Sequence, residues 1–249
     1  VLQVEAMVQL AEIHLRHAGE AKGELLWVSE ASRIKFRRPV KPGDALKVTL
    51  KREADFGPGA WRFSGQTASA DGVTCEAQFT LVQQALPLPE LPVDPPLQRP
   101  MPEGPSQIFS LSALPHRFPF MWVDCVQHSQ ELANGDGAVL GLRNITANES
   151  FFLAGTPGPL VVPQTYLLEI AAQVACAYTL ANPVNHGKLA FFMAIDQAKF
   201  TRVVRPGDQL QVAMQISLIR GRFGRSFGKI YSGDEVVAEI ELKFALGDQ

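Results

Sequence analysis

Residues 164–180 read QTYLLEIAAQVACAYTL, and this stretch decides how the rest of the chain is interpreted. It contains no proline or glycine and is apolar on nearly every side, which is typical of a helix that is buried all round. Pro163 precedes it, at a place where a missing backbone N–H costs little. We therefore expect a buried helix over residues 164–180, with Glu169 near its middle.

Segments typical of β-strands flank this helix. In the second half of the chain they are 122–130, 137–144, 189–200, 209–219, 225–231 and 236–245, and in the first half 26–36, 45–52, 61–68 and 73–81. Pro-Gly-Asp at 206–208 and Ser-Gly-Asp at 232–234 are expected turns. One long buried helix wrapped by an antiparallel sheet predicts an α+β fold of the hotdog type.

The two halves of the chain repeat one another. Residues 35–46, KFRRPVKPGDAL, match residues 199–210, KFTRVVRPGDQL, at an offset of 164 positions (199 − 35). The same offset, without a gap, places Glu5 on Glu169 and Gln9 on Gln173. Two separate blocks that share one offset indicate an internal duplication. The sequence therefore predicts a double hotdog, in which two units pair their sheets side by side.

The expected boundaries follow from a proline-rich stretch between the two halves. We assign residues 1–86 to the first unit, 87–105 to a linker and 106–249 to the second unit. Eight prolines between positions 87 and 105 argue against a helix or a central strand, so we expect the linker to cross the surface without regular structure. The first unit has no counterpart of residues 109–164. We expect roughly 55 further residues upstream of Val1 in the natural protein, with a permuted or decayed first unit as the alternative.

Composition narrows the class of protein. The chain has a formal net charge of −2 and 46% hydrophobic residues, so nothing in the overall charge indicates a nucleic acid or a membrane surface as partner. No apolar run approaches the roughly 20 residues that a membrane span requires. Residues 1–20 do not resemble a signal peptide, and the three widely spaced cysteines fit neither a disulfide framework nor a zinc site. We expect a cytoplasmic protein with reduced thiols.

Several motifs in the second half resemble one family. Residues 114–124, LPHRFPFMWVD, and 144–152, NITANESFF, are similar to segments of the 3-hydroxyacyl-(acyl-carrier-protein) dehydratases, and so are Gly158, Pro163, Glu169 and Gln173. The resemblance covers nearly all of residues 109–245 and, more weakly, 1–82. It implies dehydration of 3-hydroxyacyl thioesters on an acyl carrier protein to trans-2-enoyl thioesters, in fatty-acid or polyketide-type synthesis. It implies no metal and no organic cofactor.

The resemblance also implies which residues act. In the family a histidine three residues before the glycine at Gly158 removes the α-proton, and a carboxyl group fourteen residues after that histidine protonates the departing hydroxyl. Glu169 occupies the place of the acid, but the place of the histidine (169 − 14 = 155) is held by Gly155, which has no side chain. Because the family forms its sites between two units, we expect Glu169 to work with a histidine nine or ten residues upstream of Val1. The second pair, Gly155 with Glu5, is expected to be dead.

Glu169 also has a physical rationale as a general acid. A carboxyl group surrounded by leucine, isoleucine and alanine is expected to be neutral near pH 7, and that is the form that can donate a proton. Gln173 lies one turn later and can hydrogen-bond it. The alternative is a glutamate that reaches a helix end or pairs with an arginine. Backbone N–H groups at the helix start near Gln164, approached closely at Gly158, are the expected oxyanion donors, although the family usually has glycine where this chain has Gln164.

Two further groups have open interpretations. His116, in the Pro-His-Arg-Phe-Pro motif, either makes a structural hydrogen bond or lines the mouth of a tunnel. Basic residues near the repeated turns either attract an acidic carrier protein or are solvated turn charges; they are Arg37, Arg38, Lys41, Arg202 and Arg205. A homodimer of double hotdogs is compatible with these expectations.

Three functions compete on the sequence alone. The first is a dehydratase of carrier-bound 3-hydroxyacyl thioesters. The second is an acyl-binding or scaffold protein that has lost its chemistry, which Gly155 favours. The third is a hotdog thioesterase, in which a helix carboxylate would activate water. A histidine upstream of Val1 separates the first function from the second, and the product formed from an acyl thioester separates the first from the third.

Overall fold

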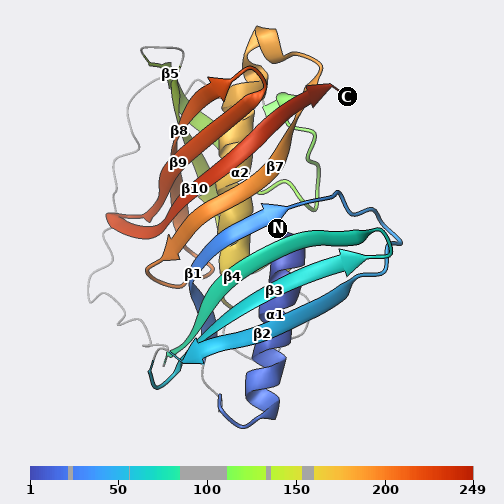
Figure 1. Cartoon of the computed structure of the whole chain (residues 1–249). Helices are drawn as coiled ribbons and strands as arrows, with labels where there is room; N and C mark the ends of the chain where they lie inside the picture. Colours follow the sequence, from blue (N-terminus) through green and yellow to red (C-terminus); the bar gives the residue numbers. More distant parts are fainter. Residues whose placement is uncertain (22–24, 56, 85–110, 133–135, 153–159, 249) are drawn as a thin grey trace, which may run out of the picture.

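The structure of the chain is a computed structural model that describes residues 1–21, 25–55, 57–84, 111–132, 136–152 and 160–248 (Figure 1). The expected linker, together with Gly155 and Gly158, lies outside these residues. The first half comprises α1 (Leu2–His17), β1 (Leu25–Phe36), β2 (Lys47–Asp55), β3 (Ala60–Ser69) and β4 (Gly72–Gln84). The second half comprises the 3-10 turn η1 (Leu111–Ala113), β5 (Cys125–Glu131), β6 (Gly137–Asn144), α2 (Gln164–Ala181), the 3-10 turn η3 (Pro183–Asn185), β7 (Lys188–Phe200), β8 (Gln209–Arg220), β9 (Phe223–Ser232) and β10 (Glu235–Asp248).

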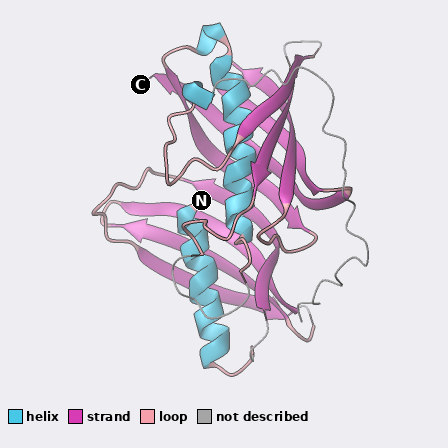
Figure 2. Cartoon of the chain, turned by 180° about the vertical axis from the view of Figure 1, so that it is seen from behind, coloured by secondary structure: helices cyan, strands magenta, loops and turns pink. Residues whose placement is uncertain are grey.

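The ten strands in the described residues form one antiparallel sheet, in the order β2-β3-β4-β1-β7-β10-β9-β8-β6-β5. The two halves meet where β1 pairs with β7, and both helices lie on the same side of the sheet (Figure 2). In this ladder Ala31 is opposite Ala198, and Ile34 is opposite Ile195. At the repeat offset of 164, Ala31 corresponds to Ile195 and Ile34 corresponds to Ala198, so the two pairs are equivalent. The junction therefore has the symmetry of a two-fold interface between similar units. The expected double hotdog with a continuous antiparallel sheet is confirmed.

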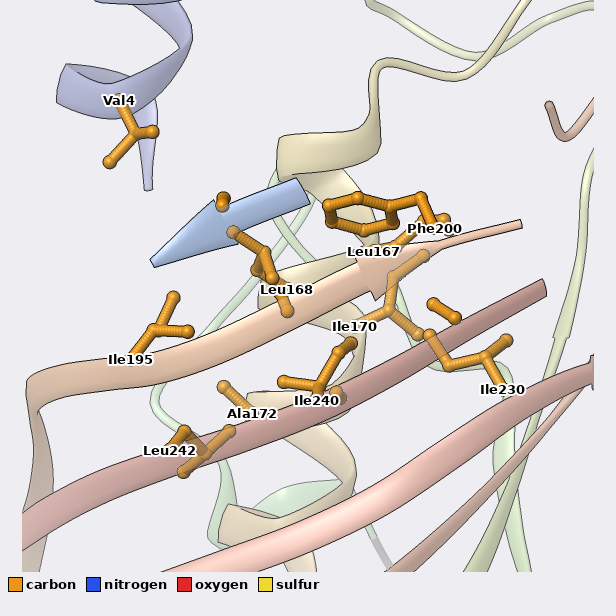
Figure 3. Close-up of a cluster of buried hydrophobic side chains, with 14 of the residues drawn as sticks. Val4, Leu167, Leu168, Ile170, Ala172, Ile195, Phe200, Ile230, Ile240 and Leu242 are labelled. Atoms are coloured by element: carbon orange, nitrogen blue, oxygen red, sulfur yellow. The ribbon is translucent and has the colours of Figure 1, made fainter. Parts of the chain in front are cut away.

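Helix α2 forms the centre of the second half, as expected for residues 164–180. Fourteen of its 18 residues are buried, which explains why apolar side chains occur all around it. Figure 3 shows Leu167 and Leu168 of α2 among Ile195 of β7 and Leu242 of β10, with Val4 of α1 nearby. The core is therefore continuous across the two halves. Asn182 and Pro183 follow the helix and begin the next 3-10 turn, in which the Asn182 side chain accepts a hydrogen bond from the Val184 amide.

The repeated Pro-Gly-Asp turns have the same construction in both halves. Gly43 and Gly207 have φ values of 96° and 98°, a region that favours glycine. One residue later, Asp44 and Asp208 accept hydrogen bonds from main-chain amides three residues earlier, both at 2.8 Å. The sequence match at an offset of 164 is thus a match in backbone geometry as well.

The strands differ from the expected bounds by up to three residues, and the start that shifts most is that of β5, from Trp122 to Cys125. The Trp122 amide donates to the Gln173 side-chain oxygen at 2.9 Å, and its indole stacks on the Tyr166 ring with centroids 4.3 Å apart. Residues 120–124 therefore lie as a loop against α2. None of the helices in the described residues has the length and hydropathy needed to cross a membrane.

Candidate active site

A cavity of about 760 Å³ lies at the junction of the two halves. The first half contributes the start of α1, from Val1 to Gln3, and the segment after β1 that contains Arg37 and Arg38. The second half contributes α2, the loop at His116 and Phe120, and strands β7 and β10. Most of the wall is apolar; the residues of β7 and β10 in it are Ala190, Phe191, Phe192, Met193, Leu242 and Phe244.

Glu169 is the carboxylic acid in the wall of this cavity. Its side chain is 8% exposed, in the second turn of α2, and Gln173 fixes its position. The Gln173 amide group donates to Glu169 Oε1 at 3.0 Å and to the Phe120 carbonyl at 2.9 Å. The Gln173 oxygen accepts from the Trp122 amide. Because both N–H groups and the oxygen of Gln173 are engaged, its orientation is determined, and Oε1 of Glu169 is held as a hydrogen-bond acceptor.

His116 is close to the same carboxyl group. Its Nε2 lies 3.4 Å from Glu169 Oε1, while its Nδ1 is buried without a hydrogen-bond partner among the described residues. The imidazole stacks with the Phe120 ring at 6.0 Å between centroids. His116 therefore lines the cavity beside the acid, so of its two earlier interpretations the placement fits the tunnel mouth.

Beyond Glu169, the surface of α2 that faces the cavity carries small residues. Ala172, Ala175 and Cys176 lie there, three to seven positions after the acid. Burial raises the pKa of the Cys176 thiol to about 12, so this thiol stays protonated and is a poor nucleophile at neutral pH. The region offers an apolar surface about 10 Å long, from the helical rise of seven residues. Such a surface suits an aliphatic chain whose reacting end lies at Glu169.

The repeat partner of Glu169 is arranged differently. Glu5 is also buried, but its Oε2 accepts a hydrogen bond from the Thr165 hydroxyl of α2 at 2.6 Å, and its Oε1 accepts one from Gln9 at 2.8 Å. Seven residues later in α1, Glu12 occupies the position that corresponds to Cys176. Burial, reinforced by the nearby negative charge of Glu5, raises the pKa of Glu12 to about 7. Glu5 therefore accepts a hydrogen bond from a hydroxyl of the other unit and has a second carboxyl group two turns away, where Glu169 has the Cys176 thiol.

The expected oxyanion residues are placed only in part. Gln164 is buried at the start of α2, and its Oε1 accepts a hydrogen bond from the Val28 amide of β1 at 3.2 Å. Its side-chain nitrogen is buried without a hydrogen-bond partner among the described residues. The side chain thus ties α2 to β1 in the first half of the sheet. Gly155 and Gly158 lie outside the described residues, and their roles stay predictions.

The five basic residues form two groups. Arg37, Arg38 and Lys41 follow β1 and are exposed, and the first two line the cavity. Arg202 and Arg205 follow β7, whose antiparallel pairing with β1 puts them at the other end of the ladder. Arg202 forms ion pairs with Asp208 at 2.9 Å and Glu235 at 3.0 Å, so it holds its own turn. The described residues contain no cluster of three or more His, Cys, Asp or Glu side chains that could hold a metal.

Two contacts of this site were not assigned from the sequence. The contact of His116 with Glu169 joins a loop to a helix far along the chain, and the hydrogen bond from Thr165 to Glu5 joins the two helices. The motif around His116 marked it as part of a family loop. No spacing in the sequence indicated which side chain it would meet.

Known proteins resemble this chain in sequence. A family model described as a FabA-like domain matches residues 114–241. The 3-hydroxyacyl-(acyl-carrier-protein) dehydratase FabZ of Desulforamulus reducens is 40% identical over 136 residues, which cover 55% of this chain and 93% of that protein. The enzyme of the same name from Geobacillus thermodenitrificans is 42% identical over 136 residues, with coverage of 55% and 91%.

Solved structures resemble the whole double unit. The dehydratase domain from the CurJ module of curacin polyketide synthase matches with a TM-score of 0.59 at 13% identity, covering 97% of this chain and 83% of that one. A putative oleoyl thioesterase from Lactobacillus plantarum matches with a TM-score of 0.58 at 10% identity, covering 99% and 88%. At these identities the likeness concerns the fold alone.

Proposed function

Because this chain belongs to the FabA-like domain family, we propose that it catalyses the dehydration of 3-hydroxyacyl thioesters carried on acyl carrier protein. The products are a trans-2-enoyl thioester and water. The observation that carries the proposal is the Glu169 carboxyl group in the wall of a largely apolar cavity between two hotdog units. The named activity of the FabZ relatives supports the same reaction.

Glu169 is proposed as the general acid. The hydrogen bond from Gln173 makes Oε1 an acceptor, so in the neutral acid the transferable proton is on Oε2. When a base removes the α-proton of the substrate, the electron pair of the C2–H bond forms the C2–C3 double bond, and the C3–O bond breaks. The departing hydroxyl takes the Oε2 proton and leaves as water. Glu169 is then a carboxylate, and transfer of the abstracted proton back to it completes the cycle.

The base is proposed to come from the first hotdog unit. The start of α1 lines the cavity, so a residue held by that unit can reach a substrate beside Glu169. In the second unit the corresponding position is Gly155, which cannot accept a proton. His116 is proposed as a positioning residue, because its Nε2 lies near the same oxygen that Gln173 holds as an acceptor. It acts through Glu169 and does not replace the base.

The partner is proposed to be an acidic acyl carrier protein that approaches at residues 37–41. Arg38 and Lys41 are exposed there, and Arg38 also lines the cavity. Arg37 forms an ion pair with Glu76 at 2.6 Å that offsets its charge, so Arg38 and Lys41 are proposed to attract the partner. A cluster of positive charges raises the association rate of a negatively charged partner.

The test uses the full natural polypeptide and a 3-hydroxyacyl thioester on carrier protein. Formation of the conjugated enoyl thioester is followed by its ultraviolet absorbance, and release of free thiol is followed in parallel. We expect enoyl product without thiol, and loss of that product in Glu169→Gln, which preserves shape but has no acidic proton. Free thiol as the main product would favour a thioesterase. Tight binding of the acyl group with neither product would favour an acyl-binding protein.

A further inference from the structure

We propose that Gln3 of α1 is a specificity-determining residue of the cavity, and that its side-chain amide donates a hydrogen bond to an amide carbonyl of the substrate's pantetheine arm. This arm is the flexible chain that links the thioester to a carrier protein. The identity of the ligand rests on the proposed dehydratase function. The inference comes from a polar cluster, made of Gln3, Thr67 and Thr74, that has no equivalent in the second unit.

Short hydrogen bonds join the three side chains of this cluster. Gln3 Oε1 accepts from the Thr67 hydroxyl at 2.6 Å and from the Thr74 hydroxyl at 2.7 Å. The two hydroxyl oxygens lie 2.8 Å apart, and both threonines are at most 1% exposed. A buried hydroxyl group that loses its partner is costly, so the two threonines hold the Gln3 side chain in one orientation.

The second unit has aliphatic side chains at the three equivalent positions. In the same order, these are Leu167, Ile230 and Val237, all 0% exposed. The strands show that the positions are equivalent, because Thr67 and Ile230 are opposite the corresponding valines of β2 and β8. The Thr74 carbonyl accepts from the Arg37 amide at 2.8 Å, and the Val237 carbonyl accepts from the amide at the matching position at 3.0 Å. Since aliphatic side chains fill this place in the second unit, packing alone does not require hydroxyl groups there.

Gln3 connects this cluster to the cavity. Its side chain lines the cavity wall, together with Ala6 one turn later on α1. Because Thr67 and Thr74 engage the oxygen of the Gln3 amide group, its nitrogen points away from them, toward the cavity. This nitrogen has no hydrogen-bond partner among the described residues. The largely apolar cavity therefore presents a fixed N–H donor, and its natural ligand is a carbonyl oxygen.

The position of Gln3 in the cavity identifies the part of the substrate that meets this donor. The aliphatic tail is expected along α2, on the small residues beyond Glu169. Gln3 is on the other helix and is bonded to Thr74, whose carbonyl accepts from the amides of Arg37 and Arg38. Gln3 is therefore beside the segment at which the carrier protein is proposed to bind. The part of the substrate between that segment and the thioester is the arm, which carries amide carbonyls.

The test measures enoyl formation by the full natural polypeptide from one 3-hydroxyacyl group on two thiols, pantetheine and propanethiol. Propanethiol has no amide group. Gln3→Leu introduces the side chain of the second unit and removes the donor. We expect KM for the pantetheine thioester to rise about three- to tenfold, the effect of one lost hydrogen bond, with kcat changed by less than about twofold. KM for the propyl thioester should not change. The matched control is Gln66→Leu, the same substitution at an exposed position of β3, which should alter neither KM.

The two threonines are tested as positioning residues. Thr67→Val with Thr74→Val keeps the shape of the cluster but removes both hydroxyl groups, so Gln3 loses the contacts that orient it. We expect KM for the pantetheine thioester to rise by about two- to fivefold, because the donor is still present but no longer fixed. The propyl thioester should again be unaffected, which a general loss of stability would not produce.

The outcomes separate this proposal from the proposed dehydratase function. An unchanged KM for the pantetheine thioester in Gln3→Leu, or an equal rise for both thioesters, would overturn the role of Gln3. Binding of S-propyl pantetheine, a thioether that cannot react, is measured by calorimetry in parallel. If the parent protein forms no enoyl product but Gln3→Leu still weakens this binding, the role of Gln3 is supported and the dehydratase function is not. Equal binding by the parent and Gln3→Leu would also overturn the role of Gln3.

Discussion

Helices α1 and α2 carry the same glutamate and glutamine, four residues apart and at matching positions of the fold, yet their surroundings differ. Glu169 borders an apolar cavity with Cys176 two turns away. Glu5 is hydrogen-bonded by the Thr165 hydroxyl and has Glu12 two turns away. The comparison shows that a buried carboxyl group at the correct helix position does not by itself make an active site. What distinguishes the two is the chemistry of their neighbours: Cys176 and Glu12 lie on the same helix as their glutamate, and the Thr165 hydroxyl comes from the other unit.

The largest difference is expected in turnover. In the full natural polypeptide, Glu169→Gln should lower kcat for dehydration by about 10²–10⁴, because the transferable proton is lost. Glu5→Gln, the matched change, should alter kcat by less than about threefold, since Gly155, at the expected place of its partner base, has no side chain. Steady-state kinetics with one substrate measures both. Equal losses of kcat in the two variants would mean that both glutamates contribute equally to catalysis, and the proposed difference between the two helices would be wrong.

The covered and uncovered faces of the two helices should differ in stability. Val174→Ala removes two methyl groups from a fully buried position against β6 and should lower the free energy of unfolding by about 2 kcal/mol. Leu10→Ala, at its partly exposed counterpart, should cost less than about 1 kcal/mol in the 249-residue chain. Urea denaturation of both variants gives the values. A larger loss for Leu10→Ala would show that the face of α1 is already covered.

Glu12, beside the second buried glutamate, should make the free energy of unfolding depend on pH. Because the pKa of Glu12 is raised to about 7 in the folded chain, ionising this group opposes folding. The stability that its neutral form provides is complete below about pH 4.5 and is lost as pH rises through about 7. Glu12→Gln should therefore match the parent at pH 4.5 and exceed it by on the order of 1–2 kcal/mol at pH 8, a reduced figure because the side chain is partly exposed. A constant difference across this range, in denaturation at several pH values, would contradict the assignment.

The smallest expected effect concerns the exposed basic residues that follow β1. Arg38→Ala with Lys41→Ala should raise KM for a carrier-protein substrate by about three- to tenfold at low salt, and less at high salt, where charges are screened. A short pantetheine thioester should show no change, because it lacks the acidic surface. Lys51→Ala on β2 is the control. An equal effect on both substrates would indicate that these residues shape the cavity and do not bind the carrier protein.

The sequence predicted much of the fold because the composition of one segment and the match between two segments can be recognised without knowing any contact. The helix over 164–180 followed from composition alone, and the offset of 164 related the strands of one half to those of the other. Contacts between the units were not predictable, because they depend on the register in which β1 meets β7. That register brings Thr165 to Glu5 and puts Arg202 at the far end of the ladder from Arg38. His116 was known as part of a motif, but its distance from Glu169 depends on how the loop before β5 crosses α2.

The junction of β1 with β7 has a consequence for how the cavity depends on protein concentration. In an assembly of two separate copies, a cavity formed at the contact exists only in the associated fraction and disappears on dilution. Here both strands belong to one polypeptide, so each molecule retains its complete junction however dilute the solution. The two copies are also free to differ, since a substitution in one half is not imposed on the other. A fused pair of this kind can keep one acid in an apolar cavity while the other half acquires groups, such as Glu12, that a symmetric pair would have to carry twice.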